Sequence, residues 1–566
     1  MEPLNSWALR AVLIAGIGVL AACGGGKPSS ATSTASAGAM LTPPALTLTP
    51  TTTRILRFNW PDMDGETTYR LLEDADGTSG YSLVTQLPAD TTQHDLEVFL
   101  PGRINARYIL QACTGASCVD SAPLSVSGSL AEAVGFLKAD APADEHEFGF
   151  SIALSEDEGT LAVGAPGEDS DFAGIAARKP SHAGVAYDSG AVYVFVREGQ
   201  RWQQQAFVKT SAPRDGDGFG FSVALSANGD SLAVGAPDDD TNGAVYLFRR
   251  QSGTWSQWQR MVTSSTGGRF GISLALSSPG QVLVVGDPQE DSVASNSGAA
   301  YVFTHDGHTW SEQAMLKAPA PQAGDLFGTS VSVNGPGGTI AVGAPDDDNT
   351  VFGGGAAYVF NGGGPTWGPP VRLTPAQPVE EQNMGRVVAL SRDGSTLAVS
   401  ASGDASTAIG INGDPTAGGA PVSGAVHVFA LRGLAWEYQA YIKASNPDQD
   451  DNFGYRVVLS NNGDTLVVSA PYERSRADGI NGAQDDNSSS EVGAAYVFQR
   501  RGADWRQQAY VKAFNSGSGD GFGHGLALSS DGLRLFSGAP GESSSGGGWN
   551  PIQDNNSIRS GAVYLY

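Results

Sequence analysis

The chain has 566 residues, and its 33 Lys and Arg against 59 Asp and Glu give a formal net charge of −26. Binding to a phosphate backbone or an anionic membrane needs a basic face, so this charge argues against nucleic acid or a membrane surface as partner. The 75 glycines, the 16% charged residues and the lack of a second long apolar run predict many short strands and turns.

The chain begins with a segment that we expect to be removed. Arg10 precedes a short apolar run, residues 11–20, which leads into Leu-Ala-Ala-Cys with the cysteine at Cys23. Such a run is typical of a secretory signal and is too short to span a bilayer permanently. It resembles the lipobox of bacterial lipoproteins, which implies a signal peptide over residues 1–22 and a lipid anchor on Cys23. The resemblance also implies an outer-membrane protein that faces the cell surface or the periplasm; the alternative is an ordinary secreted protein with a chance cysteine.

The next two regions are predicted to be a linker and a small β domain. Residues 23–44 are rich in Gly, Ser, Thr and Ala, so they cannot bury enough surface to fold and are predicted to be a flexible tether. Residues 45–128 alternate in short runs separated by Asp- and Gly-rich turns, which predicts a β-sandwich. Trp60 and the run Tyr108-x-Leu-x-Ala112 resemble a fibronectin type III domain, which implies a spacer.

Once Cys23 is assigned to the lipid, two cysteines remain. Cys113 and Cys118 are five residues apart, and an even remainder in an oxidising compartment predicts a disulfide that closes a turn. A zinc or catalytic role lacks further Cys or His partners nearby.

The rest of the chain, residues 133–566, repeats one motif seven times: Phe-Gly, then Leu-Ala-Val-Gly-Ala-Pro, then Gly-Ala-Val-Tyr-Val-Phe. The copies start at Phe148, Phe219, Phe270, Phe327, Met384, Phe453 and Phe522. Each copy holds four strand-like segments, in the second copy residues 221–226, 232–235, 244–248 and 255–262. The fold class predicted is therefore all-β, a seven-bladed β-propeller with four-stranded blades.

The two ends of the repeat region predict a closed ring rather than a linear solenoid. The chain stops after the third strand of its last copy, at Tyr566, whereas Val134–Ala139 precedes the first copy and matches the fourth-strand runs. We expect this N-terminal strand to pair with Ala562–Tyr566 and to complete the last blade, which removes an exposed sheet edge.

The three parts of the repeat together resemble the FG-GAP repeat of the integrin α-subunit propeller and its bacterial relatives. In that family Ca²⁺ is bound in the hairpin between the first two strands. Here these hairpins are short and nearly free of carboxylates, as in Ser277–Gly280 and Asn334–Gly337, so the family calcium sites are not carried over.

Carboxylates instead follow the Gly-Ala-Pro motif, in loops that a propeller would place on one face. In one reading Asp238, Asp239, Asp240 and Asp346, Asp347, Asp348 hold Ca²⁺; no cofactor is otherwise required. In the other, the acids cap turns and keep the surface soluble. The second reading is preferred because adjacent aspartates point apart on an extended loop.

Aromatic residues separate into a recurrent and a non-recurrent set. A tryptophan near the start of the fourth strand recurs in six copies, which favours packing. Trp549, Phe352 and Phe172 lie in the long loops and are the better candidates for ligand contact.

No motif for catalysis is found, neither a nucleophile elbow nor a zinc-binding His pair. We therefore expect a monomeric extracellular binding or adhesion module for protein or polysaccharide. The alternative is a propeller enzyme, a hydrolase or lyase, that acts on extracellular polysaccharide.

Overall fold

The computed structural model describes residues 41–51, 53–126, 130–181, 184–263 and 268–566. These residues form 39 strands and two short 3₁₀ turns, η1 (Leu100–Gly102) and η2 (Ala131–Ala133), with no α-helix among them. No helix in the described part is long and apolar enough to cross a membrane. The predicted signal peptide, Cys23 and nearly all of the predicted tether lie outside the described residues.

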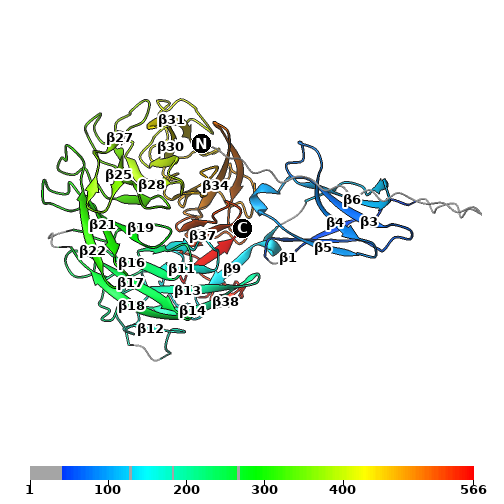
Figure 1. The fold of residues 1–566 in the computed structure, drawn as a ribbon, viewed down its shortest axis with the longest axis horizontal. Helices are drawn as coiled ribbons and strands as arrows, with labels where there is room; N and C mark the ends of the chain where they lie inside the picture. Colours follow the sequence, from blue (N-terminus) through cyan, green and yellow to red (C-terminus); the bar gives the residue numbers. More distant parts are fainter. Residues whose placement is uncertain (1–40, 52, 127–129, 182–183, 264–267) are drawn as a thin grey trace, which may run out of the picture.

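The first domain is built from two antiparallel sheets (Figure 1). One sheet has the order β1-β2-β5, and the other β4-β3-β6-β7 with β8 beside β6. Their bounds are β1 (Thr47–Thr51), β2 (Ile55–Asn59), β3 (Thr68–Asp74), β4 (Ser82–Pro88), β5 (Gln93–Glu97), β6 (Arg107–Thr114), β7 (Ser117–Asp120) and β8 (Leu124–Ser125). Phe58 and Trp60 from one sheet pack on Tyr69 and Tyr108 from the other, as alternation along the strands predicts. Cys113 and Cys118 form a disulfide across β6 and β7.

Seven antiparallel sheets follow, and in the first six the main strands of each sheet pair in sequence order. The first sheet contains β10 (Ser151–Leu154), β11 (Thr160–Ala165), β13 (Ala191–Glu198), β14 (Arg201–Val208) and the added β12 (Ile175–Ala176). The second contains β15 (Ser222–Leu225), β16 (Ser231–Ala236), β17 (Ala244–Gln251) and β18 (Thr254–Met261). The third contains β19 (Ser273–Leu276), β20 (Val282–Asp287), β21 (Ala299–His305) and β22 (Trp310–Leu316). The fourth sheet contains β23 (Ser330–Val333), β24 (Thr339–Ala344), β25 (Ala356–Gly363), β26 (Thr366–Trp367) and β27 (Val371–Leu373). The fifth contains β28 (Met384–Leu390), β29 (Thr396–Ala401), β30 (Ala425–Arg432) and β31 (Ala435–Ile442). The sixth contains β32 (Val457–Leu459), β33 (Thr465–Ala470), β34 (Ala494–Arg501) and β35 (Asp504–Val511).

The last sheet combines both ends of the repeat region. It contains β36 (Leu526–Leu528), β37 (Leu535–Ala539), β39 (Ala562–Leu565), β9 (Gly135–Lys138) and β38 (Gly548–Trp549). Val563 pairs with Leu137 and Leu565 with Gly135, which confirms the predicted closing strand. The first strands of successive sheets contact one another, and β36 contacts β10, so the sheets form a closed, β-propeller-like ring.

The Phe-Gly motif joins each sheet to its neighbour. Phe219 is fully buried and packs edge-on against Tyr246 of its own sheet, with ring centroids 5.5 Å apart. Its backbone also forms a parallel bridge with Gly190 of the preceding sheet. A Cβ on Gly190 would lie 2.0 Å from the Phe219 carbonyl oxygen, so only glycine allows this approach. The repeat therefore specifies the junction between sheets as well as the strands.

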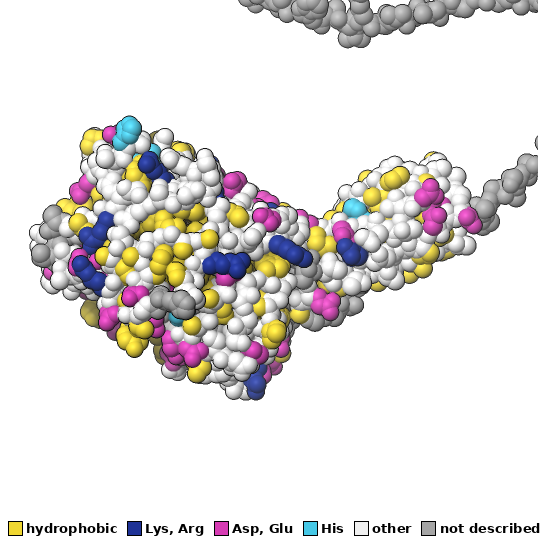
Figure 2. All heavy atoms as spheres, turned by 90° about the horizontal axis from the view of Figure 1, so that it is seen from below, with side chains coloured by type: hydrophobic (Ala, Val, Ile, Leu, Met, Phe, Trp, Pro, Cys, Tyr) yellow, Lys and Arg dark blue, Asp and Glu magenta, His cyan; other side chains and the backbone are white. Residues whose placement is uncertain are grey.

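The sandwich packs against one end of the ring. Glu97 at the end of β5 accepts hydrogen bonds from Arg54 and from Arg534 of the β36–β37 hairpin, at 2.8 and 2.7 Å. Gln200 of the β13–β14 hairpin donates to the same carboxylate at 3.1 Å. Figure 2 shows the result as a broad lobe and a narrower one, with acidic, basic and hydrophobic side chains mixed on the broad lobe.

Candidate functional site

The ring has two unlike ends. One end, which we call the turn face, carries the short hairpins between first and second and between third and fourth strands, and the sandwich binds there. The opposite end, which we call the loop face, carries the long second-to-third and fourth-to-first connections. The acidic loops predicted from the sequence all emerge on the loop face.

One acid of each long loop is a structural residue. In all seven sheets the acid three positions after the last residue of the second strand is at most 3% exposed. It forms an ion pair with the basic residue at the end of the fourth strand. The pairs are Glu168–Lys209, Asp239–Arg260, Glu290–Lys317, Asp347–Arg372, Asp404–Lys443, Glu473–Lys512 and Glu542–Lys138. A buried pair of this kind fixes the start of each loop, because either charge alone would be strongly destabilising.

The aspartates considered for Ca²⁺ are placed among partners of their own. Asp238 pairs with Arg269, and Asp240 with Arg214 and Arg260. The central residues Asp239 and Asp347 also accept hydrogen bonds from Tyr246 and Tyr358.

Asp346 and Asp348, which flank Asp347 in the sequence, have neutral partners. Asp346 accepts a hydrogen bond from Asn383, and Asp348 accepts one from the Gly353 backbone. Metal binding at either cluster stays a prediction, and it would compete with the arginine contacts already present.

A second buried acid stands beside the ion pair in four sheets, two residues before the Phe-Gly start. Burial, strengthened by the neighbouring loop acid, raises the pKa of Asp217, Asp325 and Asp520 to about 6 and that of Asp451 to about 7. In the fifth sheet Gln382 takes this position and donates to Asp404 at 3.1 Å. The loop face thus holds carboxyl groups that titrate near neutral pH.

The three predicted contact aromatics differ in their surroundings, although Phe172 and Trp549 pack against the same hydrophobic cluster. Phe352 is 65% exposed at a loop tip. Phe172 is half-buried and packs on Phe207, with ring centroids 5.9 Å apart. Trp549 lies in the short strand β38, paired with β9 at the outer edge of the last sheet, where it lines a cavity of about 530 Å³ together with Trp202.

The centre of the loop face contains a different site, which we call the axial pocket. It is a cavity of about 380 Å³ at the start of the first strands, and all seven sheets contribute to its lining. Its walls include three arginines, Arg269, Arg386 and Arg456, and no Asp or Glu. The pocket wall thus has an excess of basic residues, whereas the whole chain has 59 acidic and 33 basic residues.

Two of these arginines have no carboxylate partner among the described residues. Arg269 pairs with Asp238, whereas Arg386 and Arg456 form no ion pair there. Arg456 lies over the Tyr455 ring, 5.0 Å from its centroid. Burial, and then the like charge of Arg386, lowers the pKa of Arg456. Two guanidiniums that line one cavity and form no ion pair in the described chain are suited to a planar anion.

Comparison with known families agrees with the repeat seen in the sequence. A model of the FG-GAP repeat matches residues 202–248, 255–303, 310–360 and 436–498. The chain contains FG-GAP repeats. Each matched segment starts in the fourth strand of one sheet and ends in the third strand of the next. Each FG-GAP repeat therefore begins one strand before the sheet that it mainly forms. A strand from the start of the repeat region accordingly completes the last sheet.

Comparisons with curated sequences and with solved structures provide less information than the family match. No curated protein sequence matches the chain. Among solved structures, Pseudomonas aeruginosa periplasmic gluconolactonase PpgL is 14% identical with a TM-score of 0.41, over 80% of this chain and 98% of that one. The RRP9 WD40 repeats are 11% identical with a TM-score of 0.43, over 76% and 96%. At this level of similarity no functional argument follows.

Tyr455 in the wall of the axial pocket contacts a histidine, His524. Tyr455 Oη lies 2.6 Å from His524 Nε2, and His524 Nδ1 lies 3.3 Å from the Phe150 carbonyl oxygen. A carbonyl only accepts, so Nδ1 carries the proton and Nε2 accepts the one on Tyr455. Burial and the charge of Arg456 lower the pKa of His524 to about 3, which keeps it neutral.

Sequence reasoning missed the axial pocket, although one signal pointed to it. The residue directly after Phe-Gly differs among the FG-GAP repeats: Phe150, Phe221, Ile272, Thr329, Arg386, Tyr455 and His524. Invariant positions hold the sheets together, whereas this variable position faces the axis, as the contacts of Phe150 with Phe221 and His524 show. Only ring closure brings these residues together.

Proposed function

We propose that the chain is an extracellular binding module whose axial pocket holds an acidic group of a polysaccharide. In this proposal the ring is a seven-bladed β-propeller, the first domain is a fibronectin type III-like spacer, and a lipid on Cys23 anchors the chain to the outer membrane as a monomer. The observation that carries the proposal is the pair of guanidiniums, Arg386 and Arg456, that face one cavity without a carboxylate partner in the described chain.

The surroundings of the pocket favour one kind of acidic ligand. The loop acids around it repel a dense polyanion, and at physiological salt this repulsion acts over about 8 Å. A single carboxylate that enters the pocket escapes most of that repulsion. Aromatic and aliphatic walls, such as Phe221 and Leu526, suit the apolar face of a sugar ring. A glycan with one accessible sugar acid therefore fits better than a highly charged chain.

Titration calorimetry with uronic acid oligosaccharides tests this proposal. Charge-assisted hydrogen bonds contribute about 1.5–3 kcal/mol each, so Arg386→Ala and Arg456→Ala are each expected to weaken binding about 10- to 100-fold. Arg214→Ala is the matched control, because Arg214 is an exposed loop-face arginine paired with Asp240. Equal affinity in all three variants, or binding only of acidic peptides, would contradict a polysaccharide site at the axial pocket.

The Tyr455–His524 pair favours a second candidate function, a polysaccharide lyase. An arginine would neutralise the uronate carboxylate, and Tyr455, ionised by loss of its proton to solvent and positioned by His524, would remove the proton next to that carboxylate. The C4–O bond then breaks, a C4=C5 double bond forms, and Tyr455 passes the proton it has taken to the departing oxygen. Ultraviolet absorbance of an unsaturated product, lost in Tyr455→Phe, would support the lyase; binding without product supports the module.

A further inference from the structure

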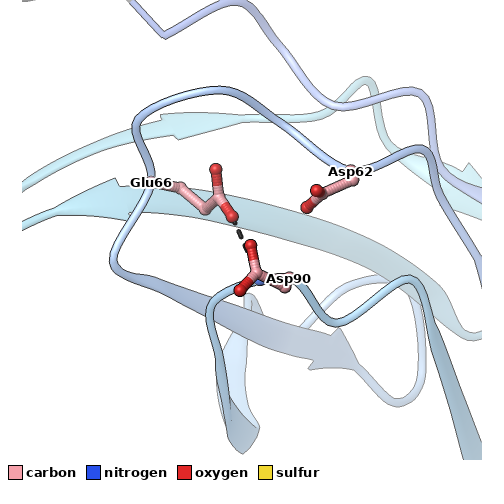
Figure 3. A group of neighbouring side chains, drawn as sticks. All are labelled: Asp62, Glu66 and Asp90. Carbon is pink, nitrogen blue, oxygen red and sulfur yellow. Dashed lines mark hydrogen bonds between the residues drawn. The ribbon is translucent and has the colours of Figure 1, made fainter.

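Three carboxylates meet at the end of the sandwich that lies away from the ring (Figure 3). Asp62 and Glu66 belong to the loop between β2 and β3, and Asp90 belongs to the loop between β4 and β5. One oxygen from each lies within 4.8 Å of the other two. Among the described residues this is the one cluster of three or more potential metal ligands, and it lies outside the repeats.

Glu66 sets this cluster apart from an ordinary group of surface acids. Its side chain is 92% buried, given an exposure of 8%, whereas Asp62 and Asp90 are exposed. Glu66 Oε1 accepts a hydrogen bond of 3.2 Å from the Asp90 backbone, whereas Oε2 has no hydrogen bond of standard geometry in the described chain, although the Tyr69 hydroxyl lies near the carboxylate. A buried carboxylate oxygen with no donor is unfavourable unless a cation approaches it. Asp62 and Asp90 lie on the side open to solvent, from which an ion can enter.

We propose that Asp62, Glu66 and Asp90 bind a divalent cation of the size of Ca²⁺. All three ligands are hard oxygen donors, which suit Ca²⁺ and Mg²⁺ rather than softer metals. Oxygens on opposite sides of Ca²⁺ lie about 4.6–5.2 Å apart, against about 4.0–4.2 Å for Mg²⁺. The three oxygens lie within 4.8 Å of one another, which is a separation that one Ca²⁺ can span. Water completes the shell on the exposed side.

The ion would strengthen the link between two loops that are already joined by hydrogen bonds from Asp90 N to Glu66 Oε1 and from Trp60 N to the Thr92 carbonyl oxygen. The strand registers place this end opposite the ring contact, since Asn59 pairs with Gln93 here and Ile55 pairs with Glu97 at the ring. Thr114 beside the disulfide hairpin donates to the Gly65 carbonyl oxygen at 2.6 Å, so the hairpin supports the same loop. The cation site and the axial pocket lie in different domains, so an experiment that refutes one of them does not refute the other.

Terbium luminescence of the full chain tests the site. Tb³⁺ resembles Ca²⁺ in its oxygen ligands, and nearby aromatic rings transfer light energy to it. Trp60 and Tyr69 lie beside the cluster, with ring centroids 5.6 Å apart and Tyr69 accepting a hydrogen bond from the Met63 backbone. We expect saturable emission from one Tb³⁺ per chain that Ca²⁺ displaces. Emission that does not saturate, or that Ca²⁺ does not displace, would overturn the proposal.

Single substitutions locate the ion. Glu66→Gln and Asp62→Asn keep side-chain shape and are expected to weaken Tb³⁺ and Ca²⁺ binding at least tenfold. Asp64→Asn, in the same loop but outside the cluster, is the matched control and is expected to bind as the wild type does. Melting curves in EDTA show whether each variant is folded, and Asp62 is exposed enough that its variant retains the fold. Wild-type affinity in both cluster variants would place the ion elsewhere and refute the site.

Discussion

Asp451 makes the stability of the ring depend on pH. Its carboxyl is 1% exposed, and its Oδ1 atom has no hydrogen-bond partner in the described chain. Burial, together with the charge of Glu473, raises its pKa from 3.8 to about 7. The folded state therefore binds a proton that the unfolded state has released, and stability falls as pH rises from about 4 to about 7.

The substitution Asp451→Asn removes this penalty and keeps the shape of the side chain. A shift of about 3 pKa units at about 1.4 kcal/mol each sets an upper limit near 4 kcal/mol, so we expect a gain of about 2–4 kcal/mol at pH 8. At pH 4 the variant and the wild type should be equally stable, because protonated Asp resembles Asn. The fifth sheet offers a precedent, since Gln382 there donates to the loop acid Asp404.

Urea unfolding at pH 4, 6 and 8, followed by tryptophan fluorescence, measures this difference. The midpoint of the variant should move above that of the wild type only as pH rises. If Asp451→Asn is instead destabilising at pH 8, then Asp451 is ionised and is held by the nearby Lys512, and the reasoning from burial is wrong. Asp450→Asn is the control, because Asp450 is an acid in the same connection whose side chain is exposed.

Three further predictions concern the ring and its anchor. Lys209→Met should destabilise the chain by about 3–5 kcal/mol in urea unfolding, because it leaves Glu168 buried without its partner. Adding Glu168→Gln should recover much of the lost stability. A double variant that recovers none of it would mean that the lysine acts through packing. Phe219→Ala should cost about 3–5 kcal/mol by the same assay, since the ring is fully buried at a sheet junction, whereas a cost below 1 kcal/mol would show that the junction tolerates the cavity. Cys23→Ser should abolish labelling by a radioactive fatty acid, and persistent labelling would place the lipid elsewhere.

The sequence predicted the ring because the information for it is local and repeated. Each copy carries its own strand pattern, its turn glycines and its Phe-Gly junction, so one physical argument applies seven times. The closing strand could also be predicted, since a missing fourth strand at one end and a spare one at the other are visible in the chain. Pairing of Tyr564 with Phe136 bears out that reasoning.

The role of the loop acids was not accessible in the same way. The sequence shows that acids follow Gly-Ala-Pro, but it does not show that the basic residue ending the fourth strand reaches back to one of them. That residue is 41 positions away from its partner in the Lys209–Glu168 pair. The contact depends on how strands lie side by side at the loop face, and its recurrence in seven sheets is the clue that a comparison of copies could have used.

The sequence by itself thus determined the strands, the repeat and the closure, because neighbouring residues encode them. Only the tertiary structure decided which side chains form a site. Arg386 and Tyr455 come from different sheets and line one pocket because the ring brings its first strands to one axis, where Tyr455 also contacts His524 of a third sheet. Asp90 likewise reaches Glu66 from another loop of the sandwich. Sites of this kind depend on distances between segments, and a linear pattern contains no such distances.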